Sequence, residues 1–116
     1  MKRLIFSLAA LVLVAAGCAQ DGAGRGADTA PPTVPNGLAI TAVPPAEVRV
    51  AWKPSRDDVG VTRYKVYRNG AYLKATDKTS LADAGLKPQT RYCYRVTACD
   101  ASGKESAQST DVCAVL

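Results

Sequence analysis

Apolar and polar residues alternate through most of the chain after residue 36, and the longest alternating run ends at Asp100. The run predicts a central β-strand with one buried face, because successive side chains of a strand point to opposite sides of the sheet. A turn sequence, Leu86-Lys87-Pro88, precedes it. The buried face carries Tyr92, Tyr94, Val96 and Ala98, and the other face carries Cys93, Arg95, Thr97 and Cys99.

Six further segments show a similar alternation, and turn signals separate them. The pattern places Trp52 on the buried face of one segment, and Tyr64 and Val66 on the buried face of another. Asn69-Gly70 predicts a tight hairpin. Short strands at this spacing are typical of an all-β sandwich of two antiparallel sheets. The further strands are a first one that includes Leu38 and Ile40, and then residues 48–52, 61–68, 72–76, 79–82 and 106–115.

The first 35 residues lack this alternation and fall into two parts. Lys2-Arg3 followed by an apolar run to Ala16 has the charged start and short hydrophobic centre of a secretory signal. Residues 15–18, Ala-Ala-Gly-Cys, resemble the lipobox of bacterial lipoproteins, which implies that Cys18 is acylated and begins the mature chain. We therefore expect a lipoprotein signal peptide over residues 1–17, a lipidated Cys18 and flexible tether over 18–35, and a folded domain over 36–116.

This reading places the mature protein outside the cytoplasm, on a membrane. In a source with two membranes, Ala19 after the cysteine resembles signals sorted to the outer membrane. Several acyl chains on one cysteine anchor a protein stably, because each buried methylene contributes about 0.8 kcal/mol. The alternative is ordinary secretion with a free Cys18.

Several spaced motifs follow one another through the folded part: Val50-Ala51-Trp52, Asp57-Asp58-Val59-Gly60-Val61, Tyr64-Lys65-Val66-Tyr67-Arg68-Asn69-Gly70, Leu86-Lys87-Pro88 with Tyr92, and Ala98-Cys99-Asp100-Ala101-Ser102-Gly103 before Ser106. They resemble a fibronectin type III domain of bacterial secreted proteins. The resemblance implies a seven-stranded immunoglobulin-like sandwich, with Tyr92 as the tyrosine corner whose hydroxyl bonds the backbone of the preceding turn. Cys99 departs from the family pattern, in which an aliphatic residue is usual. The expected core residues are Trp52, Tyr64, Val66, Leu86, Tyr92 and Tyr94.

The composition argues against an enzyme. The chain contains no histidine, which removes the commonest general base and every Ser-His or Cys-His nucleophile pair. Asp57 and Asp58 are adjacent carboxylates, but neighbours on an extended segment point apart, so a turn-forming role is favoured over acid-base catalysis or calcium binding. The net charge of +5 falls to +3 without Lys2 and Arg3, and the basic residues are interspersed with acidic ones, so we expect no nucleic-acid partner.

The three cysteines of the folded part predict a disulfide and no metal site. Their spacing lacks the close pairs of a zinc site, and no histidine completes one. A final hairpin that turns near Ser102-Gly103 pairs residues whose numbers total about 205 or 206, and 93 and 113 total 206. Opposed residues of an antiparallel pair lie within disulfide range, so we expect a Cys93–Cys113 bond. Cys99 is then left as a thiol.

The outward residues of two predicted neighbouring strands form a candidate binding face: Arg63, Lys65, Tyr67, Arg95 and Thr97. A basic stripe with one aromatic residue suits an anionic glycan or an envelope polymer, whereas the competing interpretation is a solvated sheet face with Tyr67 packed under the stem of Arg95. We expect a monomeric, non-catalytic envelope lipoprotein that binds a protein or glycan and needs no cofactor. The alternative is a structural spacer or accessory subunit with no ligand of its own.

Overall fold

The computed structural model describes residue 18 and residues 30–116. The predicted signal peptide and most of the predicted tether therefore lie outside the described residues. Among the residues that are described, no helix is long and apolar enough to cross a membrane.

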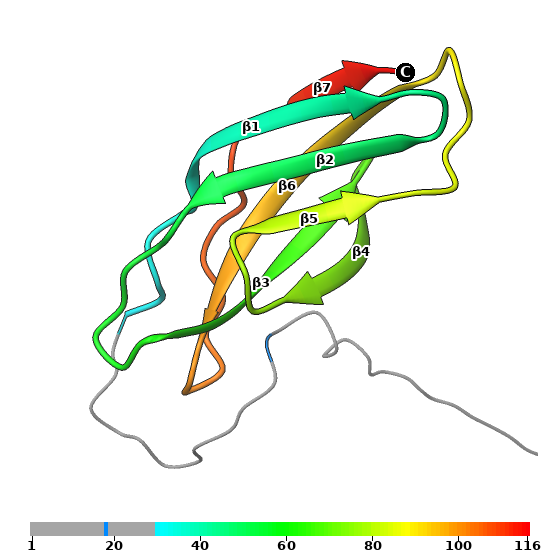
Figure 1. The fold of residues 1–116 in the computed structure, drawn as a ribbon. Coiled ribbons are helices and arrows are strands. Elements are labelled where there is room, and N and C mark those ends of the chain that lie inside the picture. The colour runs from blue at the N-terminus through cyan, green and yellow to red at the C-terminus, as the bar shows by residue number, and fades with distance from the viewer. Residues whose placement is uncertain (1–17, 19–29) are drawn as a thin grey trace, which may run out of the picture.

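Seven strands form two antiparallel sheets, which confirms the predicted all-β sandwich. One sheet has the order β1-β2-β5 and the other the order β4-β3-β6-β7, and the two lie as separate layers in Figure 1. The strands are β1 Asn36–Val43, β2 Glu47–Lys53, β3 Val61–Arg68, β4 Ala71–Thr76, β5 Ser80–Asp83, β6 Arg91–Asp100 and β7 Val112–Val115.

The core lies between the two sheets, and one face of each central strand contributes its side chains to it. Trp52 packs edge-on against Tyr64 of the opposite sheet, with ring centroids 5.5 Å apart. Burying large aromatic rings and branched side chains is the main favourable contribution to folding of so small a domain. The six residues predicted for the core are all buried, together with Val48, Val50, Val96 and Ala98.

Two tyrosine hydroxyls fix loops at the ends of the sandwich. The hydroxyl of Tyr92 accepts a hydrogen bond from the backbone N–H of Lys87 at 2.9 Å, which is the bond that the tyrosine corner requires. The hydroxyl of Tyr64 accepts from the backbone N–H of Ser55 at 2.9 Å, so it holds the start of the loop that connects β2 to β3. Each ring thus serves the core while its polar end satisfies a loop amide.

The hairpin between β3 and β4 turns at Asn69-Gly70, as the sequence predicts. Both residues have positive φ, 51° and 84°, which is the left-handed region that this two-residue turn needs and that Asn and Gly adopt most readily. The turn sets Tyr67 opposite Tyr72, next to a bulge in β4.

The last strand is shorter than the sequence predicts. It covers Val112–Val115 rather than residues 106–115, and only an isolated bridge between Cys99 and Glu105 marks the earlier part. Serine hydroxyls explain the difference, because those of Ser106 and Ser109 accept the N–H groups of Ala98 and Val96, each at 2.9 Å. Side chains thus satisfy the edge of β6 where a strand's carbonyl groups would otherwise do so.

A buried carboxylate, which the sequence interpretation did not single out, joins three strands. Asp83 at the end of β5 is 7% exposed. Its Oδ2 accepts a hydrogen bond from the hydroxyl of Tyr94 at 2.6 Å, and both its oxygens lie within 3.0 Å of Nη1 of Arg68. The contact raises the pKa of Arg68, and burial together with the Asp83 bond raises the pKa of Tyr94. Asp83 therefore cross-links the two sheets.

Candidate functional site

The five residues of the predicted binding face lie on one side of the four-stranded sheet. In the register of β3 with β6, Arg63 is opposite Cys99, Lys65 is opposite Thr97, and Tyr67 is opposite Arg95. Their neighbours Tyr64 and Val66, of the other parity, enter the core. We call the solvent side of this sheet, made by Arg63, Lys65, Tyr67, Arg95 and Thr97, the outer face.

Glu105 organises the centre of the outer face. Its Oε2 accepts hydrogen bonds from the hydroxyls of Thr97 at 2.6 Å and Tyr67 at 2.7 Å, and its Oε1 lies 3.3 Å from the ammonium group of Lys65. Thr97 and Lys65 are buried, although neither belongs to the hydrophobic core cluster. The sequence prediction did not include Glu105, because the predicted hairpin register pairs it with Asp100 or Ala101 rather than with Cys99, its partner in the structure.

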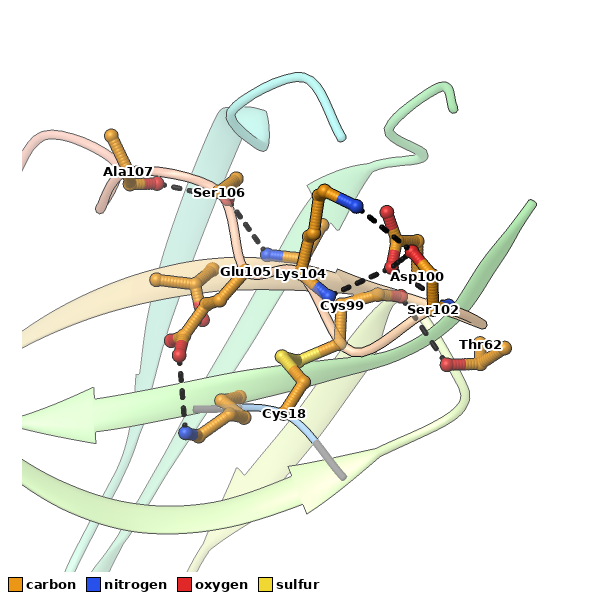
Figure 2. The surroundings of a disulfide bond; sticks show 12 residues. Cys18, Thr62, Cys99, Asp100, Ser102, Lys104, Glu105, Ser106 and Ala107 are labelled. Atoms are coloured by element: carbon orange, nitrogen blue, oxygen red, sulfur yellow. Dashed lines mark hydrogen bonds and ion pairs between the residues drawn. A yellow bond between two sulfur atoms is a disulfide. The ribbon is translucent and has the colours of Figure 1, made fainter. Parts of the chain in front are cut away.

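The turn that precedes Glu105 is fixed by Asp100. Its buried Oδ1 accepts the backbone N–H groups of Ser102 at 3.0 Å and Lys104 at 2.8 Å, as Figure 2 shows. An aspartate that bonds the amides just after it pre-forms a turn. The constrained turn therefore positions Glu105 on the outer face.

Burial and Glu105 together raise the pKa of Tyr67 to about 12. The larger cause is removal of the ring from water, and the bond to the carboxylate adds to it because that bond needs the neutral, proton-donating phenol. Tyr67 thus remains a fixed hydrogen-bond donor at physiological pH.

A second ion pair lies beside this cluster. The guanidinium of Arg95 contacts the carboxylate of Asp111 at 2.6 and 3.2 Å and the side-chain oxygen of Gln108 at 3.1 Å. The pair raises the pKa of Arg95 and lowers that of Asp111. The two side chains are 44% and 48% exposed, so both remain accessible to a ligand.

The charges of the outer face are thus largely compensated. Lys65 is paired with Glu105 and Arg95 with Asp111, and Arg63 also has an interaction partner. The sequence interpretation considered a basic stripe, but the register of the last hairpin brings acidic residues from beyond the turn onto the same face. This arrangement does not form a row of unpaired cations.

Tyr72 extends the outer face onto β4, and the sequence interpretation did not include it. The residue is 55% exposed, and its ring meets that of Tyr67 edge-on, with centroids 5.9 Å apart and planes at 69°. The ammonium group of Lys65 lies 5.3 Å from the centroid of Tyr72 and 5.9 Å from that of Tyr67. The predicted Asn69-Gly70 hairpin was a sufficient signal, because it pairs Tyr67 with Tyr72.

The structure pairs all four cysteines of the chain. Cys93 and Cys113 face each other in the register of β6 with β7, and their Cα atoms are 4.0 Å apart across a disulfide. Cys99, expected to be a thiol, is instead bonded to Cys18, with Cα atoms 5.6 Å apart (Figure 2).

The prediction of a free thiol at Cys99 is wrong because it left Cys18 out of the possible partners. The sequence interpretation assigned Cys18 to a lipid and so did not consider it as a partner, although Cys99 projects from the outer face within its reach. The acylation of Cys18 stays a prediction. A thioether to lipid and a disulfide to Cys99 use the same sulfur, so one molecule carries only one of them.

The carboxylate of Asp57, in the loop between β2 and β3, has a structural role. Oδ2 of Asp57 accepts the backbone N–H of Val59 at 3.1 Å, which closes a local turn of the kind predicted. Within residue 18 and residues 30–116, no group of three or more His, Cys, Asp or Glu side chains is gathered closely enough to hold a metal ion.

The family model for the fibronectin type III domain matches residues 30–112. The chain belongs to the fibronectin type III family. This fibronectin type III chain is 44% identical over 85 residues to "Chitinase Chi52" of Paenibacillus xylanexedens, an alignment that covers 73% of this chain and 16% of that enzyme. It is also 44% identical over 82 residues to "Exoglucanase B" of Cellulomonas fimi, covering 71% of this chain and 8% of that protein.

Solved structures give the same fold. "Chitinase ChiA74 from Bacillus thuringiensis" superposes with a TM-score of 0.65 at 31% identity over 72% of this chain and 13% of the enzyme. The structure named "Structure of FN3tt mut" superposes with a TM-score of 0.63 at 21% identity, over 74% of this chain and 97% of that chain. The chain spans a small fraction of the length of the enzymes it matches, so the similarity concerns one module and not a whole enzyme.

Proposed function

We propose that this fibronectin type III chain is an exported, non-catalytic module, held at a bacterial membrane by a lipid on Cys18, that binds an envelope polysaccharide or protein through its outer face. The observation that carries the proposal is the outer face itself. On that face the exposed Tyr72 lies two strands from the accessible Arg95–Asp111 ion pair. Tyr67 lies between them, and a hydrogen bond to Glu105 fixes its position. Fixed polar groups beside an exposed aromatic ring are common in binding sites, because little ordering is needed when a ligand arrives.

The relatives support a polysaccharide as one class of partner. The similar segments belong to proteins named as a chitinase, an exoglucanase and an alpha-amylase, and they make up 16%, 8% and 6% of those proteins. Catalysis in this chain is disfavoured, because the sequence has no histidine and the described Glu105, Asp83 and Asp111 carboxylates are held in ion pairs.

Export is supported by the chemistry of the cysteines. Disulfides such as Cys93–Cys113 form and persist mainly in oxidising compartments. The basic start, the short apolar run and the small residues before Cys18 support delivery to a membrane as a lipoprotein. In the anchored form the sulfur of Cys18 carries lipid, and Cys99 then has a thiol in place of the disulfide.

A structural spacer without a ligand is the second candidate function. The compensated charges of the outer face favour it, since exposed ion pairs on a sheet also serve simply to keep the surface soluble.

A pull-down from envelope extract of the source bacterium, with Arg95→Ala as the test variant, separates the two functions. Arg49→Ala is the matched control, because Arg49 forms a comparable exposed ion pair with Glu47 on the other sheet, at 2.6 Å. We expect the wild type and the Arg49 variant to retain a partner that the Arg95 variant loses. Absence of any partner of the wild type would support the spacer, and equal loss in both variants would refute binding through the outer face.

A further inference from the structure

We propose that the outer face binds a neutral polysaccharide chain, with Tyr72 as the residue on which a sugar ring stacks. The inference rests on the binding function proposed above and assigns its ligand class and its main contact residue. Tyr72 carries the only exposed aromatic ring among the large hydrophobic side chains of the described residues.

Tyr72 offers its ring in a fixed orientation. It lies at the edge of the sheet, where Tyr67 supports it edge-on and the ammonium group of Lys65 sits against the two rings. Tyr67 is itself held by the bond from its hydroxyl to Glu105 at 2.7 Å. The face of an aromatic ring is electron-rich and attracts positively polarised hydrogens, and one side of a sugar ring presents such C–H groups.

A row of side chains continues from this ring across the sheet. Tyr72 is the register partner of Tyr67, and Tyr67 is the register partner of Arg95. Strands are spaced about 4.8 Å apart, so these three residues span about 10 Å perpendicular to the strands. Asp111 lies next to Arg95 and forms an ion pair with it. An extended glycan placed along this row meets the aromatic ring first and the ion pair next.

The ion pair is suited to sugar hydroxyls. A guanidinium offers only donors and a carboxylate only acceptors, and the side chain of Gln108 adds an amide to the same group. Neighbouring hydroxyls of a sugar both donate and accept, so they match this arrangement. Both charged side chains are about half exposed, so a ligand can reach them without a rearrangement of the protein.

The charge balance selects a neutral chain rather than an anionic one. Lys65 is neutralised by Glu105 at 3.3 Å and Arg95 by Asp111 at 2.6 Å. An anionic polymer would have to compete with these carboxylates for the two cations, whereas a neutral polymer leaves both pairs intact. Affinity is then expected to depend on stacking and hydrogen bonds and to change little with salt.

Retention of the purified full chain on insoluble chitin and on microcrystalline cellulose tests the inference. We expect the wild type to bind at least one of them, and Tyr72→Ala to weaken the dissociation constant about tenfold, which corresponds to about 1.4 kcal/mol. Tyr72→Phe keeps the ring and should bind nearly as the wild type does. Val34→Ala, at an exposed apolar residue ahead of β1, is the control for general adhesion and should change nothing.

Three results would overturn the inference. One is polysaccharide binding that is unchanged in Tyr72→Ala, and another is binding only to an anionic polymer that is lost in high salt. The third is no retention on either polysaccharide. In that third case the envelope pull-down still tests the proposed function separately. A protein partner that the wild type retains and Arg95→Ala loses would support binding through the outer face.

Discussion

Replacing Asp83 with alanine should strongly destabilise the domain. The carboxylate is almost fully buried and is the acceptor for Tyr94 at 2.6 Å and for Arg68 at 2.9 Å. Its removal leaves a phenolic hydroxyl inside the sandwich with no acceptor at that position, and it leaves a guanidinium without its counter-charge. The ring of Tyr94 cannot leave its site because it is fully buried, whereas Arg68 is partly exposed.

The magnitude follows from the burial of the two partners. Tyr94 is fully buried, and an unsatisfied buried hydroxyl costs about 1–3 kcal/mol. Arg68 is 34% exposed at its side chain, so water recovers part of its solvation and the loss falls below the 3–5 kcal/mol typical of a fully buried broken pair. We expect about 3 kcal/mol in total, which is a large share of the roughly 5–15 kcal/mol that stabilises a domain.

Urea unfolding of Asp83→Ala, Tyr94→Phe and the double variant measures this contribution. We expect a coupling free energy of about 1 kcal/mol or more between the two residues, because each single change removes the same hydrogen bond. Asp111→Ala is the control, since it also removes a carboxylate from an arginine but at an exposed position, and it should cost less than about 1 kcal/mol. Additive single effects, or a cost of Asp83→Ala no larger than that of the control, would refute the role assigned to Asp83.

Three further outcomes are expected. Replacing both Cys93 and Cys113 with serine should lower the free energy of unfolding by about 3 kcal/mol, because the bond closes a loop with a sequence separation of 20. Denaturant unfolding measures this loss, and a loss below about 1 kcal/mol would contradict the prediction. Trp52→Ala should cost about 3–5 kcal/mol and leave little folded protein by circular dichroism, whereas a stably folded variant would show that the ring is not essential to the core. The pKa of Tyr67 is raised from about 10 in the unfolded chain to about 12, so its contribution to stability should be complete below pH 10 and disappear as the pH rises towards 12. Titration of the assigned Tyr67 ring resonances by NMR measures this, and Glu105→Gln should lower the value; an unchanged pKa in that variant would exclude the carboxylate as a cause.

The strands and the core were predictable because they depend on local alternation. In β6, one parity enters the core and the other faces outward, and a strand cannot be shifted by one residue without exposing Tyr94 and Val96. The hairpin at Asn69-Gly70 was predictable for a similar reason, since few residue pairs adopt positive φ at both positions.

The structure differs from the sequence prediction where side chains replace backbone interactions or where residues distant in the sequence meet. Strand β7 begins late because the hydroxyls of Ser106 and Ser109 bond the edge of β6, and alternation does not report such bonds. The compensation of the outer face depends on Glu105 and Asp111, which reach it from beyond a turn. The predicted register, in which paired numbers total about 206, places Asp111 opposite Arg95, but it does not indicate that Glu105 meets Lys65 and Tyr67 of the next strand.

One disulfide of this chain could be predicted from the sequence and the other could not. The pairing of Cys93 with Cys113 depends on hairpin register, which is local and can be counted. The bond between Cys18 and Cys99 has a sequence separation of 81, and no periodicity connects two such positions. The lipid that we propose on Cys18 and the disulfide to Cys99 exclude each other, because both use the same sulfur.

The proposed display of this module on a membrane depends most directly on Cys18, and peptide mapping by mass spectrometry of protein isolated from the membrane fraction tests it. We expect a mature chain that begins at an acylated Cys18, with Cys93 linked to Cys113 and Cys99 present as a thiol. Cys18→Ser should remove the protein from detergent-extracted membranes. A Cys18–Cys99 linked peptide from the membrane fraction, or unchanged membrane partitioning of Cys18→Ser, would contradict the lipid anchor.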